Sequence, residues 1–316
     1  MIDKDVFLSG IMGLVVGDAL GLPAQFLKRE EVARNPVTGM RAGYGMPAGS
    51  WSDDSSLAIA TLMSLITYGY NPQDVMKRFV AWYDKGEYTP FGNAFDIGLT
   101  CEDAILNFED GEDIYHCGLS GEENNGNGSL MRILPACIYF AARNIRDDEA
   151  VQKIETLSAL THGHKRSRIG CGLYYFMVKE ILYETGIIQD LLQAGVNKGF
   201  KYYGDEAEVH YYDRLRDLPR LSNVDVSDIS TSGYVVDSLV SSTWGIITTE
   251  SYKDALLKLV NLGDDADTVG AIAGGLAGLY YGYKCIPHEW LESVIKREKI
   301  EEICRRADLW INHGLK

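Results

Sequence analysis

Two short acidic segments carry the residues of this sequence that are best suited to chemistry. The first, G-S-W-S-D-D-S at positions 49–55, places a hydroxyl group beside two carboxylates. The second, V-N-L-G-D-D-A-D-T-V-G at 260–270, gathers three aspartates and a threonine within five positions. Each segment leads into an apolar run of helical length. Carboxylates at this density repel one another and resist burial, so a positive partner is needed to compensate them.

Helix capping and metal binding are the two interpretations of these segments. Taken alone, the first fits an N-cap, with Ser52 capping and Asp53 and Asp54 near the positive end of the helix dipole. Taken together, the segments offer six or more oxygen ligands and no nitrogen or sulfur, which suits Mg²⁺, Mn²⁺ or Ca²⁺. We therefore predict a site for one or two divalent cations. Paired acidic clusters of this kind also suit a divalent-metal phosphohydrolase.

Composition excludes several classes of function. The chain of 316 residues is 46% hydrophobic and has a formal net charge of −15, which argues against binding to a nucleic-acid backbone. Its six cysteines show no C-x-x-C spacing, so reduced thiols are expected. The apolar segment 8–22 is interrupted by Asp18 and preceded by Asp3 and Asp5, which is unlike a signal peptide or a membrane span. We expect a cytoplasmic protein without membrane contact.

The apolar residues recur almost everywhere at helical spacing, and period-two strand patterns are absent. The stretches 118–129 and 201–233 are predicted to be long loops. We expect one all-α domain spanning residues 1–316, with no linker between independent units. The predicted helices cover residues 56–68, 74–84, 149–160, 170–184, 187–199, 235–248, 252–262, 269–283 and 289–310.

Glycine recurs every four residues in two of the apolar segments. Gly13, Gly17 and Gly21 form one stripe, and the other comprises Gly270, Gly274, Gly278 and Gly282. Each glycine costs a helix about 1 kcal/mol relative to alanine, so the stripes indicate helices whose backbones approach closely. Such packing could bring the polar ends of the helices together.

These motifs, in this order, resemble the ADP-ribosylglycohydrolase family. The resemblance covers essentially the whole chain and is most specific in the two aspartate motifs and the N-G-N-G-S-L-M-R segment. It rests on G-D-A-L-G-L-P at 17–23, W-S-D-D-S at 51–55, N-G-N-G-S-L-M-R at 125–132, T-H-G-H at 161–164, S-G-Y-V-V-D-S-L at 232–239 and L-G-D-D-A-D-T-V-G-A-I-A-G-G-L-A-G at 262–278.

The resemblance implies a single compact orthogonal helical domain and two Mg²⁺ or Mn²⁺ ions. Asp264 is then not a ligand, and Ser52 stands where the family usually has threonine. The implied partners are ADP-ribose and an ADP-ribosylated protein or other acceptor, and we expect a monomer. The implied metal ligands are Ser52, Asp53, Asp54, Asp265, Asp267 and Thr268.

The loop at 125–132 resembles the family's cradle for diphosphate and ribose. Glycine lets backbone N–H groups approach phosphate closely, although Asn-Gly repeats also form plain turns. The family places a histidine near the ribose and an aromatic ring against adenine. The implied substrate-binding residues are Asn125, Gly126, Asn127, Gly128, Ser129, Met131, His162 and Tyr234.

One position departs from the family pattern. Gln25 stands where the family has a glutamate that assists proton transfer or positions substrate, and a glutamine cannot act as a general base. With Gln25, the resemblance makes Asp54 and Asp265 the catalytic candidates. We expect a metal-activated water to cleave the glycosidic bond between ADP-ribose and its acceptor, for which an arginine side chain is preferred. The alternative is an ADP-ribose-binding pseudoenzyme. On sequence alone, Gln25→Glu is expected to raise kcat about 10²-fold.

Overall fold

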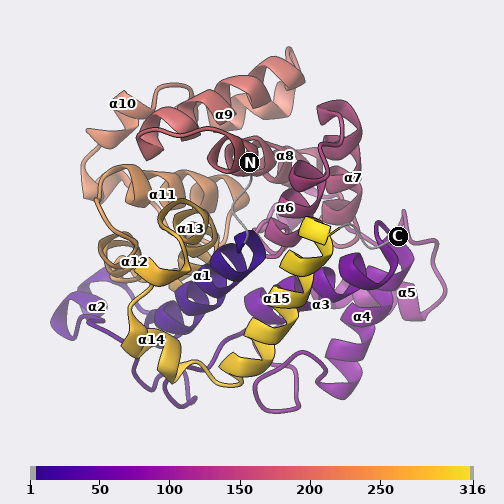
Figure 1. The fold of residues 1–316 in the computed structure, drawn as a ribbon, viewed down its shortest axis with the longest axis horizontal. Coiled ribbons are helices and arrows are strands. Elements are labelled where there is room, and N and C mark those ends of the chain that lie inside the picture. Colours follow the sequence, from indigo (N-terminus) through magenta and orange to yellow (C-terminus); the bar gives the residue numbers. More distant parts are fainter. Residues whose placement is uncertain (1–4, 314–316) are drawn as a thin grey trace.

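The computed structural model describes residues 5–313, which form helices joined by loops (Figure 1). Those residues contain no β-strand, only three isolated bridges, so the predicted all-α fold class is confirmed. The helices are α1 (Val6–Gly21), α2 (Arg29–Arg34), α3 (Asp53–Tyr68), α4 (Pro72–Lys85), α5 (Leu99–Glu109), α6 (Leu134–Ala142), α7 (Asp147–Ala159), α8 (Lys165–Tyr183), α9 (Ile188–Tyr203), α10 (Leu218–Ser222), α11 (Val235–Ile247), α12 (Tyr252–Val260), α13 (Ala266–Tyr281), α14 (His288–Ser293) and α15 (Arg297–His313).

Helices α1 and α13 pack against each other along their lengths at the centre of the fold (Figure 1). Their glycine stripes face one another: a Cβ added to Gly17 would lie 2.0 Å from the carbonyl oxygen of Gly270, and one added to Gly13 would lie 2.3 Å from that of Gly274. Backbones at this separation leave no room for any side chain. The close packing predicted from the glycine spacing is confirmed.

The central position of α1 accounts for its composition. Every residue of α1 is buried, so the helix is apolar around its whole circumference instead of along one stripe. By length and hydropathy the segment Val6–Ala24 could span a membrane, but its apolar window is buried inside the protein.

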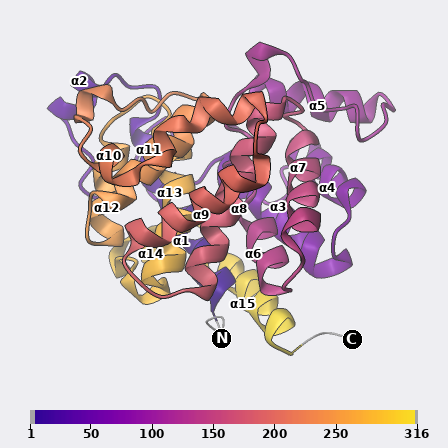
Figure 2. The same ribbon diagram turned by 90° about the horizontal axis from the view of Figure 1, so that it is seen from above.

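The other helices surround this pair. Helices α8 and α9 lie side by side across the face seen in Figure 2. Helices α3 and α6 pack against α1, α6 also packs against α8, and α4 packs against α3. The buried hydrophobic side chains form one continuous cluster. This arrangement brings the first turns of α3 and α13, which carry the two acidic motifs, to the same place.

The prediction of one helix over 289–310 is wrong. The chain leaves helical geometry between α14 and α15, where Lys296 has φ 59°. Tertiary hydrogen bonds take up the backbone of this break: Ile295 N–H donates to Gly49 O at 3.0 Å, and Trp51 Nε1 donates to Ile295 O at 2.8 Å. These distant partners leave no trace in the local periodicity.

The prediction of a loop over 201–233 is also wrong in part, because the segment contains a 3₁₀ helix at Ala207–Arg216 and the short helix α10. The many tyrosines and charged residues of this segment obscured the pattern of its buried residues, among them Val209, Tyr212 and Leu215. Helices α2, α5 and α6 were not predicted, although α6 is almost wholly buried.

Candidate metal and ligand site

The first acidic motif begins α3 and is held in place from α1. Ser52 is the N-cap, and its Oγ accepts the backbone N–H of Asp54 at 3.3 Å, so the capping interpretation is correct for this residue. Asp18 of α1 receives the backbone N–H groups of Ser52 and Ser55 and the Ser55 hydroxyl at 2.5–3.1 Å. Capping and site formation are therefore compatible, because Asp18 anchors the turn while Asp53 and Asp54 remain available.

The second acidic motif begins α13 directly beside the first. Thr268 Oγ1 lies 3.4 Å from Asp54 Oδ2, and carboxylate oxygens of Asp18, Asp54 and Asp267 all lie within 4.8 Å of one another. The structure thus brings together all six predicted metal ligands, which come from segments more than 200 residues apart in the chain. Asp264 is exposed and takes no part in this cluster.

The electrostatics of the cluster fit bound cations. Burial, together with the neighbouring carboxylates, raises the pKa of Asp53, Asp54 and Asp267 well above its ordinary value. Both carboxylate oxygens of Asp267 and Oδ1 of Asp54 are buried without a hydrogen-bond partner. Buried carboxylate oxygens are normally satisfied, and hard divalent cations are their preferred partners. The donor set therefore suits Mg²⁺ or Mn²⁺.

A cavity of about 300 Å³ opens onto this cluster. Asp53, Asp265 and Thr268 line it, while Ser52, Asp54 and Asp267 lie behind them. The remaining walls come from the turn before α2, the start of α5 and the loop before α6. The predicted residues that line the cavity are Gln25, Asp53, Gly126, Asn127, Gly128, Met131, His162, Asp265 and Thr268.

A third carboxylate region, which was not predicted, closes one side of the cavity. Asp96 accepts a hydrogen bond from Gln25 Nε2 at 2.7 Å, and the hydroxyl of Tyr44 lies 3.4 Å from its other oxygen. Burial raises the pKa of Asp96. Gln25 is therefore in direct contact with a carboxylate that faces the same cavity.

The rim of the cavity is built from strained backbone. Phe26, Tyr44, Asp96 and Asp264 have φ between 53° and 59°, a region that bulky residues rarely adopt. Phe26 N–H donates to Asp264 O at 2.6 Å, and Asp264 N–H donates to Leu27 O at 2.8 Å, which fixes the turn against the second acidic motif. Strain of this kind clusters at functional sites. In this conformation Phe26 is 63% exposed, and its ring lies edge-on to that of Tyr44.

The loop at 125–132 meets the acidic cluster through Asn127. Its Nδ2 donates to Asp265 Oδ2 at 2.6 Å and to Ser238 Oγ at 2.9 Å, and its backbone N–H donates to Gly233 O. Gly126 and Gly128 lie against the ring of His162, where a Cβ at Gly128 would approach Cε1 to 2.8 Å. Glycine is required at Gly128 because a side chain would fill the space between the loop and His162.

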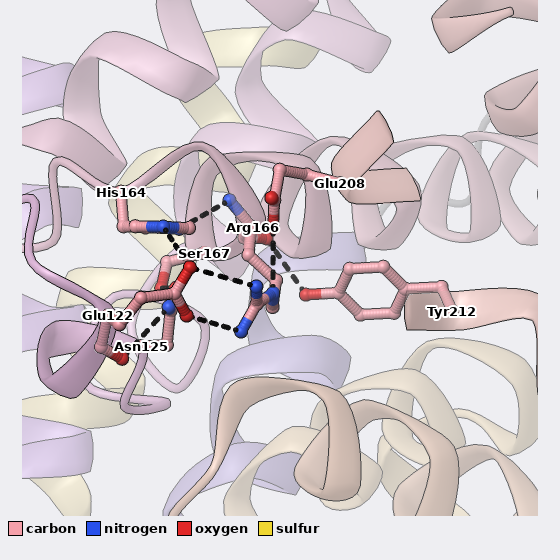
Figure 3. A network of polar contacts seen from close by, with 7 residues as sticks. All are labelled: Glu122, Asn125, His164, Arg166, Ser167, Glu208 and Tyr212. Carbon is pink, nitrogen blue, oxygen red and sulfur yellow. Dashed lines mark hydrogen bonds and ion pairs between the residues drawn. The ribbon is translucent and has the colours of Figure 1, made fainter. Parts of the chain in front are cut away.

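Three predicted ligand-binding residues lie away from the cavity wall. Ser129 is buried and hydrogen-bonded to Ser158. Asn125 points toward Ser167 and the Glu122 carbonyl, within the network of Figure 3. Tyr234 pairs with Gly126 through a backbone bridge, and its ring lies 5.8 Å from the guanidinium of Arg166.

The network in Figure 3 fastens this loop to α8. Arg166 donates to Glu122 at 3.2 Å and to Glu208 at 2.8 Å, and Tyr212 donates to the Arg166 carbonyl at 2.9 Å. The guanidinium also stacks 3.5 Å from the centre of the Tyr211 ring. The loop is therefore held by an ion-paired arginine on one side and by Asn127 on the other.

Sequence reasoning missed Asp18 and Asp96 as members of the site. The sequence did carry a signal for Asp18, because it is the lone charged residue in an apolar segment. In the structure its side chain is fully buried. Asp96 had none, because it stands singly in a loop whose course is set by tertiary contacts.

Comparison with known proteins places this geometry in a family. A family model described as ADP-ribosylglycohydrolase matches residues 2–315. The chain belongs to the ADP-ribosylglycohydrolase family. It is 28% identical to the ADP-ribosylarginine hydrolase Tri1 of Serratia proteamaculans, over 94% of this chain and 77% of that protein. It is likewise 28% identical to the ADP-ribosyl-[dinitrogen reductase] glycohydrolase of Rhodospirillum rubrum, over 96% and 95%.

The fold agrees with a solved structure of the same family. A chain described as an ADP-ribosylglycohydrolase-related protein complex superposes with a TM-score of 0.78 at 27% identity, covering 96% of this chain and 97% of that one. The resemblance first seen in the motifs thus extends to the whole fold.

Proposed function

We propose that this member of the ADP-ribosylglycohydrolase family is a metal-dependent hydrolase that removes ADP-ribose from a modified acceptor, with arginine preferred. The observation that carries the proposal is a buried carboxylate cluster, with unpartnered oxygens on Asp54 and Asp267, that adjoins a cavity beside a glycine loop. The carboxylates suit cations, and the loop suits a diphosphate. The names of the relatives support the same chemistry.

The acidic cluster would hold the ions. Ser52, Asp53 and Asp54 would contribute from α3, and Asp265, Asp267 and Thr268 from α13, while Asp18 keeps the α3 turn in position. Two Mg²⁺ or Mn²⁺ ions would neutralise these charges and, when bound, act as Lewis acids toward water and the ribose hydroxyls. The Asn127 amide, fixed on Asp265, ties the substrate loop to the metal ligands.

Proton transfer is assigned to Asp96. Its carboxylate faces the cavity with a raised pKa, which makes it a better base near neutral pH than an ordinary aspartate. Gln25 holds it through the 2.7 Å hydrogen bond. In this scheme Asp96 takes the proton of the water that forms the new bond to the anomeric carbon. The acceptor leaves with the electron pair of the broken glycosidic bond and receives that proton back from Asp96. Gln25 positions the base instead of being one.

The rim of the cavity favours a cationic acceptor. The exposed ring of Phe26 and the ring of Tyr44 stand beside Asp96. Aromatic faces and a carboxylate together suit the planar guanidinium of arginine. Two relatives named as ADP-ribosylarginine hydrolases support the same acceptor.

The test is release of ADP-ribose from matched peptides ADP-ribosylated on arginine or on serine, before and after metal removal. We expect release from the arginine peptide with Mg²⁺ or Mn²⁺, and none after chelation. Asp264→Asn is the matched control, because it removes a charge from the same motif without touching the cluster. Release of inorganic phosphate instead of ADP-ribose would identify a phosphohydrolase and overturn the proposal.

Gln25 favours one second candidate, an ADP-ribose-binding protein with little hydrolysis. The chain has the cavity and the loop that such a protein needs, but it has Gln25 where the family pattern has a glutamate. The same assay separates the two, because a binder would take up ADP-ribose in calorimetry while leaving both peptides intact.

A further inference from the structure

A buried arginine without a carboxylate partner lies behind the ligand cavity. The Arg132 side chain is fully buried, and its Nε and Nη1 have no hydrogen-bond acceptor. Nη2 donates to Leu157 O at 3.2 Å and to Thr161 Oγ1 at 2.9 Å, and the guanidinium lies 4.6 Å from the centre of the Phe79 ring. In the described part of the chain no carboxylate pairs with it. An unpaired buried charge destabilises a core, which indicates that this one serves another purpose.

Thr161 connects this arginine to His162. The threonine hydroxyl accepts the Arg132 hydrogen bond and lies 2.8 Å from His162 Nδ1. The acceptors that face its proton include Nδ1 and the sulfur of Cys101. An imidazole nitrogen accepts a hydrogen bond far better than a thiol sulfur does. The positive charge of Arg132 also favours the His162 tautomer in which the nitrogen nearer to Arg132 carries a lone pair and not an N–H.

The opposite nitrogen of His162 faces the ligand loop. Cβ atoms added to Gly128 and Gly126 would lie 3.2 and 3.4 Å from Nε2, and the residue lines the cavity. Burial and the Arg132 charge lower the pKa of His162 to about 3, so the ring is neutral near pH 7. A neutral imidazole carries one proton, and which nitrogen holds it decides whether the cavity meets a donor or an acceptor.

We propose that Arg132, acting through Thr161, holds His162 in the tautomer protonated on Nε2, so that a neutral N–H donor points at the loop around Gly126 and Gly128. The ligand would then present an acceptor oxygen there, and this part rests on the proposed function, in which ADP-ribose supplies it. No lysine or arginine lines the cavity within residues 5–313. Arg132 is therefore a positioning residue, and His162 is the group that meets the ligand.

The tautomer can be measured directly by ¹⁵N NMR of histidine-labelled protein, with the His162 signals assigned by their loss in His162→Asn. We expect wild-type protein to show protonated Nε2 and unprotonated Nδ1. Arg132→Met and Thr161→Val should shift His162 toward the other tautomer or a mixture, and Arg132→Lys should restore the wild-type pattern. Protonated Nδ1 in wild-type protein, or an unchanged tautomer in both variants, would overturn the assignment.

Affinity for ADP-ribose gives the second readout. Loss of one well-placed donor corresponds to roughly tenfold weaker binding, which we expect by calorimetry for Arg132→Met and Thr161→Val, with Arg132→Lys closer to wild type. Arg143→Met is the matched control, since Arg143 also lies over aromatic rings but is exposed; it should bind as wild type does. Equal weakening in the control would overturn the specific role.

The two proposals fail in distinguishable ways. If the wild-type protein does not bind ADP-ribose with Mg²⁺ or Mn²⁺ present, the proposed function is overturned, and the NMR tautomer still decides the role of Arg132. If Arg132→Met does not fold, Thr161→Val, which preserves side-chain volume, decides between the outcomes. A wild-type tautomer and wild-type affinity in Thr161→Val would overturn the proposal that Arg132 acts on His162 through Thr161.

Discussion

Asp267 is the residue whose surroundings most demand a cation. It is fully buried, neither of its carboxylate oxygens has a partner, and burial and the adjacent Asp265 and Asp54 raise its pKa. Its position on the first turn of α13 gives only partial compensation, because a helix end carries about half a unit charge. The residue is thus costly in the metal-free protein and well placed once cations bind.

Asp267→Asn should therefore separate stability from metal binding. We expect the metal-free variant to melt at a higher temperature than the metal-free wild type at neutral pH, since it no longer has to bury a carboxyl group that is ionised in the unfolded state. Saturating Mn²⁺ should raise the melting temperature of wild type and leave that of the variant nearly unchanged. Calorimetry checks the cause: undiminished Mn²⁺ affinity in both Asp267→Asn and Asp53→Ala would show that the acidic cluster is not the metal site. Asp264→Asn is the control.

A second residue-scale prediction concerns Asp96 and Gln25. Asp96→Asn should lower kcat by about 10²–10⁴-fold with a much smaller change in ADP-ribose affinity, because a base acts mainly in the transition state. Gln25→Glu should change kcat less than about tenfold, because two carboxylates in contact share one proton. This revises the gain expected from sequence alone. Steady-state kinetics on the arginine peptide test both, and a large gain in Gln25→Glu would show that Asp96 is not the base.

At this scale the sequence reveals acidic residues that are clustered in it and misses those that stand alone. The candidate ligands of the two acidic motifs are recognisable because hydroxyl and carboxylate groups recur together before an apolar helix, and the structure brings the two motifs together. Asp18 and Asp96 are single aspartates, and only the fold shows that one anchors Ser52 and the other faces Gln25. Side-chain direction was equally inaccessible for Ser129, which turns into the core.

Among the elements, the crossing of α1 with α13 decides the geometry of the site. Asp18 stands one residue after Gly17, and Asp267 stands three residues before Gly270, so the closest backbone approach lies next to both carboxylates. A change in the spacing of these helices would move Asp18 relative to the α3 turn that it anchors. The glycine contacts therefore set the distances within the acidic cluster.

Gly17→Ala should accordingly reduce both stability and metal affinity. The added methyl group would lie 2.0 Å from the Gly270 carbonyl oxygen, and overpacking against backbone typically costs about 1–3 kcal/mol, more than the roughly 1 kcal/mol that alanine gains in helix propensity. Gly10→Ala on the same helix is the control, since its methyl group would meet only movable side chains at 3.0 Å or more. Urea denaturation and Mn²⁺ calorimetry measure the two effects. Equal stability and equal Mn²⁺ affinity in the two variants would show that the close contact of α1 with α13 does not determine the geometry of the site.

Element prediction succeeded where a single helix carries its own pattern and failed where tertiary contacts override it. The apolar spacing of α12 and the glycine stripe of α13 are local properties. The break between α14 and α15 depends on hydrogen bonds from Ile295 and Trp51 to distant partners. The short helices within 201–233 contain too few apolar residues to show a period.

At the scale of the whole molecule, the formal net charge of −15 makes the buried acidic cluster harder to ionise. Burial raises the pKa of Asp18 from 3.8 to about 7, and burial also raises that of Asp53, Asp54 and Asp267. In the metal-free protein the folded state therefore keeps protons that the unfolded state has already lost. Divalent cations would replace those protons, so metal and pH act on the same groups.

This coupling fixes the sign of a pH dependence. Because the folded pKa of these carboxyl groups lies above the unfolded value, their contribution to stability is fully present below the unfolded pKa near 3.8 and is lost as the pH rises through the folded pKa, about 7 for Asp18. The melting temperature of the metal-free protein should therefore fall by several degrees between about pH 5.5 and pH 8. Saturating Mg²⁺ or Mn²⁺ should flatten the slope, because bound cations favour the ionised form, and Asp267→Asn should reduce it without metal. Differential scanning fluorimetry across this range makes the comparison, and an identical slope with and without metal would show that the cluster does not exchange protons for cations.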